Sequence, residues 1–460
     1  MTQNGTSVAD KRTDLRFSSV DDFMNHLAQR NPGEKNFLES VQEVVESVWD
    51  LINVERRYSE FNILERITEP ERMILFRVPW VDDDGTVHVN RGFRIEFSSV
   101  LGPYKGGLRF HPSVNLDVLK FLGFEQTFKN SLTTLSMGGG KGGSDFDPKG
   151  RSDQEVMRFC HSFMSELYRH IGARTDVPAG DIGVGAREIG YLFGQYKKLT
   201  NRFDGTLTGK SLNWGGSPMR AEATGYGTVY FVQELLATRE ETLEGKKVVI
   251  SGSGNVAQYA AEKAMQLGGS VVALSDSRGT VHIPSGMNEE QLEYVKHLKN
   301  VKRESISEFA EEFGFSWHES AKPWGVKCDV ALPCATENEL DEEDAKTLLG
   351  NGCYVIAEGA NKPCTPAALD IVHQKKLLFG PGKAANAGGV AVSGLEMSQN
   401  GMHTQWTREK VDNRLHNIMR SIHEKCVQYG DTRDGVDYIR GANVGGFIKV
   451  ADSMIEQGVV

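Results

Sequence analysis

The chain has 460 residues, a composition typical of soluble globular proteins and a formal net charge of −10 at pH 7. One hydrophobic core rarely serves so long a chain, so we expect two domains. The negative charge excludes a protein that coats nucleic acid, because neutralising phosphates requires a basic face. The N-terminal stretch is polar, unlike a signal peptide, and no segment has the roughly 18 apolar residues of a membrane span. We therefore expect a cytoplasmic protein with no membrane partner.

The first hundred residues change from a helical to a β-rich pattern. Apolar residues recur at helical spacing on one face of the stretch 36–52: Phe37, Val41, Val44, Val45, Val48 and Leu51. Residues 72–99 contain two β-rich runs around an Asp-Gly turn, which predicts a hairpin. Helical patterns return near residue 114 and over residues 153–170, so this part combines helices with strands.

The stretch 136–148, SMGGGKGGSDFDP, places Lys141 among five glycines. A P-loop is excluded, because Leu135 stands where its first glycine belongs and Gly142 replaces the hydroxyl residue after its lysine. Two interpretations of this stretch alone stay open. It is either a flexible surface loop or a site in which substrate lies against bare backbone beside one amine.

A break at Gly215, Gly216 and Pro218 indicates a domain boundary. A helical pattern over 223–236 follows, and then a strand, a glycine-rich turn, a helix and a strand over 246–279. Short apolar runs at 328–334, 354–360 and 377–382 predict further buried strands of a parallel sheet. The fold class is therefore α/β.

The last part of the chain is helical and is expected to pack back on the first domain. One long amphipathic helix is marked by Val411, Leu415, Ile418, Ile422 and Cys426. The six cysteines lie far apart in mostly apolar surroundings and form no Cys-x-x-Cys pair: Cys160, Cys328, Cys334, Cys353, Cys364 and Cys426. This pattern is typical of reduced core thiols, so we expect no metal site and no disulfide framework.

Gly252, Gly254 and Ala257 form a G-x-G-x-x-A turn between the predicted strand and helix. The first glycine permits a tight turn, the second lets the backbone approach a pyrophosphate, and the small third residue allows close packing. The free N–H groups at the start of the helix would then face the phosphates. The sequence therefore predicts a dinucleotide site.

The residues after the second strand leave the choice of dinucleotide open. Asp276 at the strand end would accept hydrogen bonds from a ribose 2′-hydroxyl and so favours NAD. Ser277 and Arg278 follow it, and basic residues lie a helix away: Lys299, Lys302 and Arg303. These could neutralise the 2′-phosphate of NADP, or they could form a solvated basic face.

Other lysines lie in motifs rich in glycine or aromatic residues: Lys105 in GPYKGGLRFHP and Lys129 in GFEQTFKNSLTTL. Asp181 lies between glycines in DVPAGDIGVGAREIG. Three lysines in one pocket would repel one another, and burial would disfavour their charged forms, so the pKa of one would move toward neutrality. The other two would hold the two carboxylates of a substrate.

Taken together, these stretches resemble the hexameric, NADP-linked glutamate dehydrogenases. The resemblance runs through GPYKGGLRF, FEQTFKN, MGGGKGGSDFDPKG, DVPAGDIGVG, EATGYG, GSGNVAQY, ALPCATENEL, AEGAN and GKAANAGGVAVSGLEMSQN. It implies reversible oxidative deamination of L-glutamate to 2-oxoglutarate and ammonium, with hydride transfer to NADP, by a homohexamer. It also implies a substrate-binding and oligomerisation domain with a mixed sheet over residues 1–210, to which 390–460 return, and a Rossmann-type NADP-binding domain over 211–389.

The resemblance also implies roles for individual residues. Lys141 matches the catalytic lysine and Asp181 the residue that handles the amine protons. Lys105 and Ser393 would bind the side-chain carboxylate of the substrate, Lys129 with Gln126 beside it would bind the α-carboxylate, and Gly180 would offer a carbonyl. The residues expected to bind the cofactor are Thr224, Gly252, Gly254, Asn255, Val256, Asp276, Ser277, Lys299, Asn361 and Asn386.

Four alternatives were weighed against this assignment. A dehydrogenase acting on leucine, valine or phenylalanine needs no cation for the side chain, so Lys105 and Ser393 argue against it. A regulatory protein that lost catalysis would lack Lys141 or Asp181. A lysine Schiff-base enzyme that uses pyridoxal phosphate does not explain the G-x-G-x-x-A turn. An NAD-linked glutamate dehydrogenase stays open because of Asp276.

Overall fold

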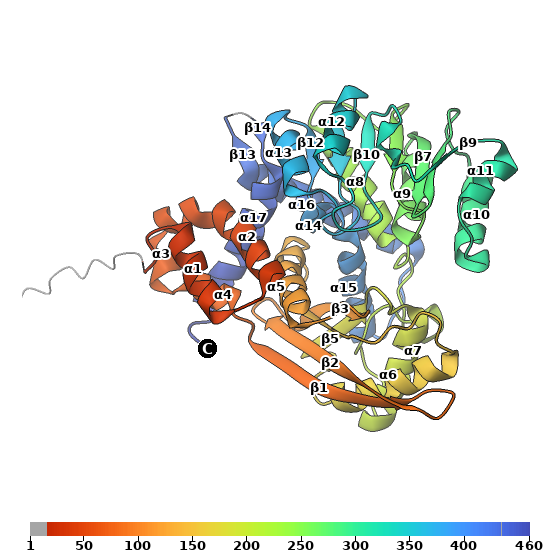
Figure 1. Ribbon diagram of the computed structural model, residues 1–460. Coiled ribbons are helices and arrows are strands. Elements are labelled where there is room, and N and C mark those ends of the chain that lie inside the picture. Colours follow the sequence, from red (N-terminus) through yellow and green to blue (C-terminus); the bar gives the residue numbers. More distant parts are fainter. Residues whose placement is uncertain (1–15, 434) are drawn as a thin grey trace, which may run out of the picture.

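The computed structural model describes residues 16–433 and 435–460. Two separate large sheets, each flanked by helices, build two units that lie one above the other in Figure 1, with the helix Gly388–Gly401 between them. None of the helices in the described part of the chain is long and apolar enough to cross a membrane.

The first unit begins with four helices, continues with a sheet and ends with short irregular segments. Its elements are α1 (Val20–Arg30), α2 (Lys35–Val54), α3 (Arg56–Glu60), α4 (Ile63–Thr68), β1 (Arg72–Val81), β2 (Val87–Ser98), β3 (Tyr104–Phe110), α5 (Leu116–Leu132), β4 (Gly139–Ser144), α6 (Asp153–Leu167), β5 (Asp176–Gly180), α7 (Ala186–Thr200) and η1 (Leu212–Trp214).

The sheet of the first unit is mixed and has the order β1-β2-β4-β3-β5. Strand β2 is antiparallel to both β1 and β4, whereas β3 is parallel to β4 and β5. Helix α5 and the apolar face of α2 cover one side, where Phe93, Ile95 and Phe97 of β2 are buried. Helices α6 and α7 cover the other side, around Leu108 and Phe110 of β3.

The second unit alternates strands and helices, and the chain ends in helices. Its elements are α8 (Ala223–Ala237), β6 (Lys247–Ile250), α9 (Asn255–Gln266), β7 (Ser270–Asp276), β8 (Gly279–His282), α10 (Glu289–His297), the π-helical η2 (Leu298–Lys302), α11 (Ser307–Phe313), β9 (Ser316–Glu319), η3 (Pro323–Gly325), β10 (Val330–Leu332), α12 (Glu342–Gly350), β11 (Val355–Ala357), α13 (Pro366–Gln374), β12 (Leu378–Gly380), α14 (Gly382–Ala385), α15 (Gly388–Gly401), α16 (Arg408–Gly430), β13 (Asp431–Thr432), β14 (Gly435–Val436) and α17 (Tyr438–Glu456).

The sheet of the second unit has the order β12-β11-β10-β6-β7-β8-β9. The five strands from β12 to β7 are parallel, which is the Rossmann-type arrangement with its glycine-rich turn after β6. Strands β8 and β9 are antiparallel to their neighbours and extend one edge. Near the C-terminus, α16 packs on α8 and on α17, while α17 packs back on α2 and α5 of the first unit.

The structure confirms most of the elements expected from the sequence. The hairpin, the helix 36–52, the strand–turn–helix–strand unit and the long amphipathic helix are all present, with Leu51 only half-buried and Ile52 buried in its place. The structure also decides between the two interpretations of the glycine-rich stretch. Residues 139–144 form the buried strand β4, so a flexible surface loop is excluded.

Candidate active site

The glycines of β4 let neighbouring segments approach more closely than any side chain would permit. A Cβ atom on Gly106 of β3 would lie 1.6 Å from the carbonyl oxygen of Gly140, and one on Gly139 would lie 2.0 Å from Oγ1 of Thr127 in α5. These contacts pull β3, β4 and α5 together. Lys105, Lys129 and Lys141 lie one on each of these adjoining elements; Lys105 and Lys141 are buried, and Lys129 is half-buried.

Asp181, directly after β5, lies between two cations. Its Oδ1 is 3.1 Å from Nζ of Lys141, and its Oδ2 accepts a 2.7 Å hydrogen bond from Nε of Arg109. Burial raises the pKa of Asp181, but the charges of Lys141 and Arg109 outweigh it and hold the pKa well below its usual range. The pKa of Lys141 is lowered, because burial and then the charge of Arg109 outweigh the attraction of Asp181.

Lys105 is fully buried on β3. Its Nζ donates to the carbonyl of Val177 at 3.0 Å and to Oγ1 of Thr208 at 2.7 Å. Burial lowers the pKa of Lys105 well below its usual value, and the nearby carboxylate of Glu396 opposes this shift. Glu396 lies three residues after Ser393 in α15, so both residues lie on the same face of that helix.

Lys129, near the end of α5, connects the two units. Its Nζ donates to Oδ1 of Asn361 at 2.9 Å and to Oδ1 of Asn386 at 2.8 Å. Burial and then the charge of Lys141 lower its pKa to about 8. The expected effect of burial and lysine repulsion is thus present, and all three lysines have lowered pKa values. Gln126, one turn earlier, donates instead to Asn130 at 2.7 Å.

The turn after β6 has the features of a phosphate cradle. Gly252 has a φ of +82°, which favours glycine, and a Cβ atom on Gly254 would meet nothing within 4 Å. Helix α9 begins at Asn255 without a side-chain cap, so the N–H groups of its first turn face open space. These observations fit a diphosphate. Val256 packs beside Gly225 of α8 and Gly359, which fixes the helix against its neighbours.

Asp276, at the end of β7, is oriented toward its own loops. Its Oδ1 accepts from the N–H of Arg278, and its Oδ2 accepts from the N–H of Ile306 and from Oγ of Ser305. Although burial raises the pKa of Asp276, these hydrogen bonds and the charge of Lys299 keep it below its usual value. Lys299 donates to the carbonyl of Glu304 at 2.7 Å and lies 3.7 Å from Asp276. Lys299 is thus held at the carboxylate, whereas Ser277 and Arg278 are exposed.

The structure adds two arginines that the sequence analysis missed. Arg109 lies in the quoted motif GPYKGGLRFHP, but only the pairing of β3 with β5 shows that it reaches Asp181. Arg220 lies just before the motif EATGYG, near Lys105 and Glu396, and its buried Nε has no hydrogen-bond partner among the described residues. A buried N–H donor without a partner is available to an anionic ligand.

Of the other expected residues, Gly180 lies in the first unit, whereas Thr224 and Asn386 belong to the second. The carbonyl of Gly180 lies beside Gly107, next to Asp181 and Lys141, and Thr224 of α8 lies against Gly389 at the start of α15. Asn386 also donates to the carbonyl of Ala360 at 2.8 Å. The lysine cluster and the asparagines of the second unit therefore form one continuous region.

The chain is similar to known proteins over nearly its whole length. Residues 215–458 match the family model described as Glutamate/Leucine/Phenylalanine/Valine dehydrogenase, and residues 70–198 match its dimerisation domain. The chain is 56% identical to an NAD(P)-specific glutamate dehydrogenase of Xylanibacter ruminicola, covering 94% of this chain and 98% of that protein. It is 55% identical to an NADP-specific glutamate dehydrogenase of Haemophilus influenzae, covering 96% and 99%.

A solved structure agrees in fold as well as in sequence. The crystal structure of a glutamate dehydrogenase from Plasmodium falciparum superposes with a TM-score of 0.93 at 52% identity, covering 97% of this chain and 98% of that one. The two family-model matches include the elements that carry the lysines and the turn after β6. The chain therefore belongs to the Glu/Leu/Phe/Val dehydrogenase family.

Proposed function

We propose that the protein is a glutamate dehydrogenase that converts L-glutamate reversibly to 2-oxoglutarate and ammonium with NADP as the hydride carrier. The observation that carries this proposal is the buried contact of Lys141 with Asp181 beside Lys129, which reaches the second unit through Asn361 and Asn386. Lys105 and Lys129 can each bind one carboxylate, and Lys141 can exchange protons with an amine. This set of groups suits a substrate that has two carboxylates and one amine. The names of the similar proteins support the same reaction.

Each carboxylate of the substrate has its own proposed ligands. Lys105 binds the side-chain carboxylate together with Ser393, and Arg220 adds a third donor because its Nε lies buried without a partner among the described residues. Lys129 binds the α-carboxylate and exchanges its asparagine partners for the stronger charge-assisted contact. Gln126 lies beside it, and the carbonyl of Gly180 accepts from the amine.

Lys141 performs the proton transfers, and Asp181 positions both Lys141 and the substrate amine. In the oxidative direction the amine must be neutral before hydride leaves Cα, and water must then attack the imine carbon. Lys141, whose pKa is lowered, is the group that releases and retakes a proton more readily than an ordinary lysine. Asp181 stays ionised because of its low pKa, so it accepts a hydrogen bond from the substrate amine and holds Lys141 in place. Arg109 orients Asp181.

The dinucleotide is proposed to lie across the carboxyl ends of β6 and β7. When bound, it accepts the hydride of glutamate or returns it to the imine. The N–H groups of Asn255 and Val256, at the turn of Gly252 and Gly254, would hold its diphosphate, and Thr224, Asn361 and Asn386 would hold the nicotinamide end. Preference for NADP follows from Asp276, whose carboxylate is occupied by the loops, and from the exposed Ser277 and Arg278. Lys299 influences the choice of cofactor by holding the Asp276 carboxylate in this position.

We further propose the division of the chain into residues 1–210 with 390–460 as the substrate-binding and oligomerisation domain, and 211–389 as the NADP-binding domain. Between α7 and α8 the chain contains only the short η1, which supports a boundary there. A homohexamer is proposed because β1 and β2 expose an apolar strip that consists of Met73, Leu75, Val81, Val87 and Val89. We propose a cytoplasmic location, in line with reduced cysteines, all six of which are buried free thiols.

A panel of amino acids tests the proposed reaction. The purified protein is given NADP with glutamate, aspartate, leucine, valine or phenylalanine, and the absorbance of the reduced nicotinamide is followed. We expect glutamate to be oxidised with a kcat/KM at least about a hundredfold above the others, because a buried lysine without its carboxylate costs several kcal/mol. A higher rate with leucine, valine or phenylalanine would overturn the substrate assignment.

A further inference from the structure

One face of the nucleotide-binding sheet is covered less completely than the other. On the first face, Val248, Val271 and Val281 pack against α9, α10 and α11. On the second face, the alternate residues Val249 and Val272 pack toward Trp324 of η3. Strands β8 and β9 join the sheet as antiparallel strands, and the short η3 packs on β7 and β8 at this part of the second face.

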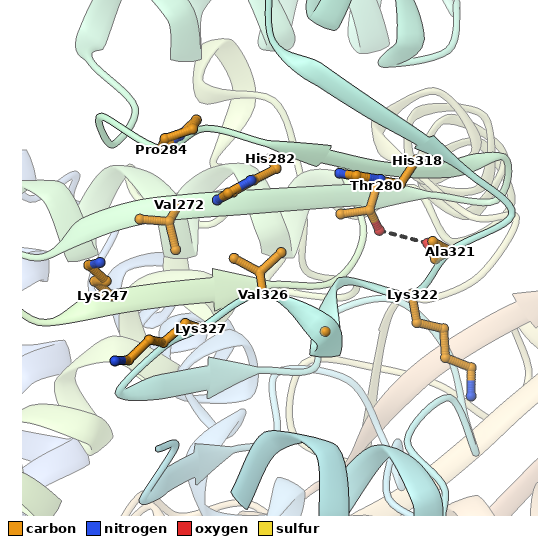
Figure 2. Close-up of a pocket in the computed structure, with 11 residues that line it drawn as sticks. Lys247, Val272, Thr280, His282, Pro284, His318, Ala321, Lys322, Val326 and Lys327 are labelled. Atoms are coloured by element: carbon orange, nitrogen blue, oxygen red, sulfur yellow. Dashed lines mark hydrogen bonds between the residues drawn. The ribbon is translucent and has the colours of Figure 1, made fainter. Parts of the chain in front are cut away.

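A pocket of about 560 Å³ lies on this second face, beside η3. We call it the basic pocket, and its lining residues are Lys247, Val272, Thr280, His282, Pro284, His318, Ala321, Lys322, Gly325, Val326 and Lys327. Five of these side chains are basic and none is acidic. Figure 2 shows Lys247 and Lys327 at one end of the pocket, with His282 reaching from β8 toward Val272 and Val326. A cavity of this size suits a small molecule.

The basic charge at this end of the pocket is not neutralised within the described residues. Lys322, at the other end of the pocket in Figure 2, is paired with Asp341 at 3.1 Å and Asp344 at 2.5 Å. In residues 16–433 and 435–460, no carboxylate lies within 4.0 Å of the amines of Lys247 or Lys327 in an ion pair. The nearby carboxylate of Asp329 accepts the backbone N–H of Lys247 at 2.7 Å.

His282 lies within the same cluster of positive charge. Its register on β8 places it opposite Ala273, and Thr280, on the same side of the strand, is paired with His318 of β9. Burial lowers the pKa of His282, and the neighbouring His318 and Lys247 lower it further. The imidazole is therefore neutral at pH 7 without a ligand, and an anion between it and Lys247 would relieve the repulsion.

The basic pocket is separate from the proposed dinucleotide cradle. The cradle follows the carboxyl end of β6 at Gly252–Asn255, whereas Lys247 is the first residue of that strand. Pro284, just beyond the end of the antiparallel β8, lies at the same edge as Lys247. A ligand at Lys247 and Lys327 would therefore lie at the opposite edge of the sheet from the diphosphate of the dinucleotide.

We propose that the basic pocket binds a second ligand, a small molecule with a phosphate chain, outside the catalytic cleft. The phosphates lie between Lys247, Lys327 and His282, where N–H donors and positive charge converge. Val272, Val326 and Pro284 offer an apolar surface to any organic part of the ligand. The same phosphate chemistry would be met by an organic triphosphate or by inorganic polyphosphate.

Calorimetric titration with two matched probes tests this proposal. The full-length protein is first saturated with NADP and then titrated, at constant ionic strength, with inorganic tripolyphosphate or with ATP. We expect one site per chain, and we expect the double variant Lys247→Ala with Lys327→Ala to bind both probes at least about tenfold more weakly. The matched control, Lys35→Ala with Lys149→Ala, removes the same charge from exposed positions of the first unit and should bind like the wild type.

The outcomes separate the proposal from its rivals. Tighter binding of ATP than of tripolyphosphate supports an organic phosphate, and equal affinities support inorganic polyphosphate. Absence of binding to the NADP-saturated wild type would overturn the proposal, as would equal weakening in the control variant.

Acetylation of surface amines, read by mass spectrometry, gives a measurement without mutation. Tripolyphosphate should protect Lys247 and Lys327 but not Lys149, and unchanged acetylation would contradict the proposed site.

Discussion

At the scale of single residues, the candidate site is governed by the sharing of one carboxylate between two cations. Asp181 contacts Lys141 and Arg109, and this pairing keeps the aspartate ionised although it is buried. An ionised Asp181 is a weak base, so proton exchange falls to Lys141, whose pKa is lowered. This division of roles follows from the electrostatics and could not be read from the sequence.

Replacing Lys141 tests that division. Lys141→Ala should lower kcat for glutamate by about 10² to 10⁴ while the dissociation constant for NADPH changes little, because general acid–base help has that magnitude. Steady-state rates and NADPH fluorescence titration measure the two effects. Lys120→Ala is the matched control, since Lys120 is also buried in the first unit but pairs with Glu34. A Lys141→Ala enzyme with more than a tenth of the wild-type kcat would remove Lys141 from the mechanism.

Arg109 should influence the pH dependence of the reaction through its charge. Its guanidinium lowers the pKa of both Lys141 and Asp181, so Arg109→Gln should raise the pKa of each. Lys141 must be neutral to act as a base, so the acidic limb of kcat for glutamate oxidation should move to higher pH. The profile is compared with that of Arg77→Gln, an exposed arginine of β1. An unmoved limb with a lower kcat would mean that Arg109 only supports the fold.

At the scale of helices and strands, the sequence predicts the elements that local spacing determines, but not those that depend on close packing between distant segments. Helices α2 and α16, the hairpin and the turn after β6 follow from spacing and turn residues that act locally. The five glycines of the stretch 136–148 favour a loop on local grounds, so local pattern alone does not predict strand β4. Tertiary contacts make it a strand, since side chains at Gly106 or Gly139 would collide with Gly140 or Thr127. Strands β8 and β9 gave no signal because their sequences, GTVH and SWHE, contain no apolar run.

The π-helical segment η2 offers a test of how the loops set cofactor preference. Lys299 and Lys302 both lie in η2, but only Lys299 pairs with Asp276 among the contacts of the described chain. Lys299→Glu would place a carboxylate beside Asp276 and remove the hydrogen bond to Glu304. We expect KM for NADPH to rise about tenfold or more, since a charged hydrogen bond contributes about 1.5 to 3 kcal/mol. Lys302→Glu should change KM for NADPH far less. If both variants change KM equally, the total positive charge of η2 sets the affinity for NADPH, and the contact of Lys299 with Asp276 does not.

At the scale of the whole molecule, buried ion pairs join the two units around the cleft. Lys383 of α14 contacts Glu125 of α5 at 3.2 Å and Glu43 of α2 at 3.3 Å. The Glu125 carboxylate is buried, yet the charges of Lys383 and Lys362 keep its pKa below the usual value. Together with Lys129, these pairs hold the second unit against α5. The sequence showed the lysines, but not that they bridge two units, because such pairs join residues far apart in the chain.

The hairpin of β1 and β2 carries the surface on which the proposed assembly depends. The strip shares one face of the two strands and consists of Met73, Leu75, Val81, Val87 and Val89, which are 39–67% exposed. The exposed Arg77 and Arg91 lie between the two ends of the strip. Exposed apolar residues on a sheet favour association with another copy of the chain. The residues lie in the segment matched by the family's dimerisation domain.

Charges placed on this strip should dissociate the oligomer. Leu75→Glu with Val89→Glu should yield a smaller species than the wild type in size-exclusion chromatography with light scattering, because burying unpaired carboxylates is costly. Val301→Glu, at an equally exposed apolar residue of η2, is the control and should leave the mass unchanged. A double variant with the wild-type mass would place the main interface elsewhere.

The central claim is that this site reduces 2-oxoglutarate and ammonium with NADPH. The most direct measurement is the initial rate of loss of reduced nicotinamide absorbance, with 2-oxoglutarate and ammonium saturating and NADPH or NADH varied in turn. We predict activity that requires both substrates, with kcat/KM for NADPH at least about tenfold above that for NADH, in line with 1.5 to 3 kcal/mol of charge-assisted binding to the 2′-phosphate. Absence of turnover with either cofactor would contradict the assigned reaction, and a kcat/KM for NADH equal to or above that for NADPH would contradict the assigned cofactor.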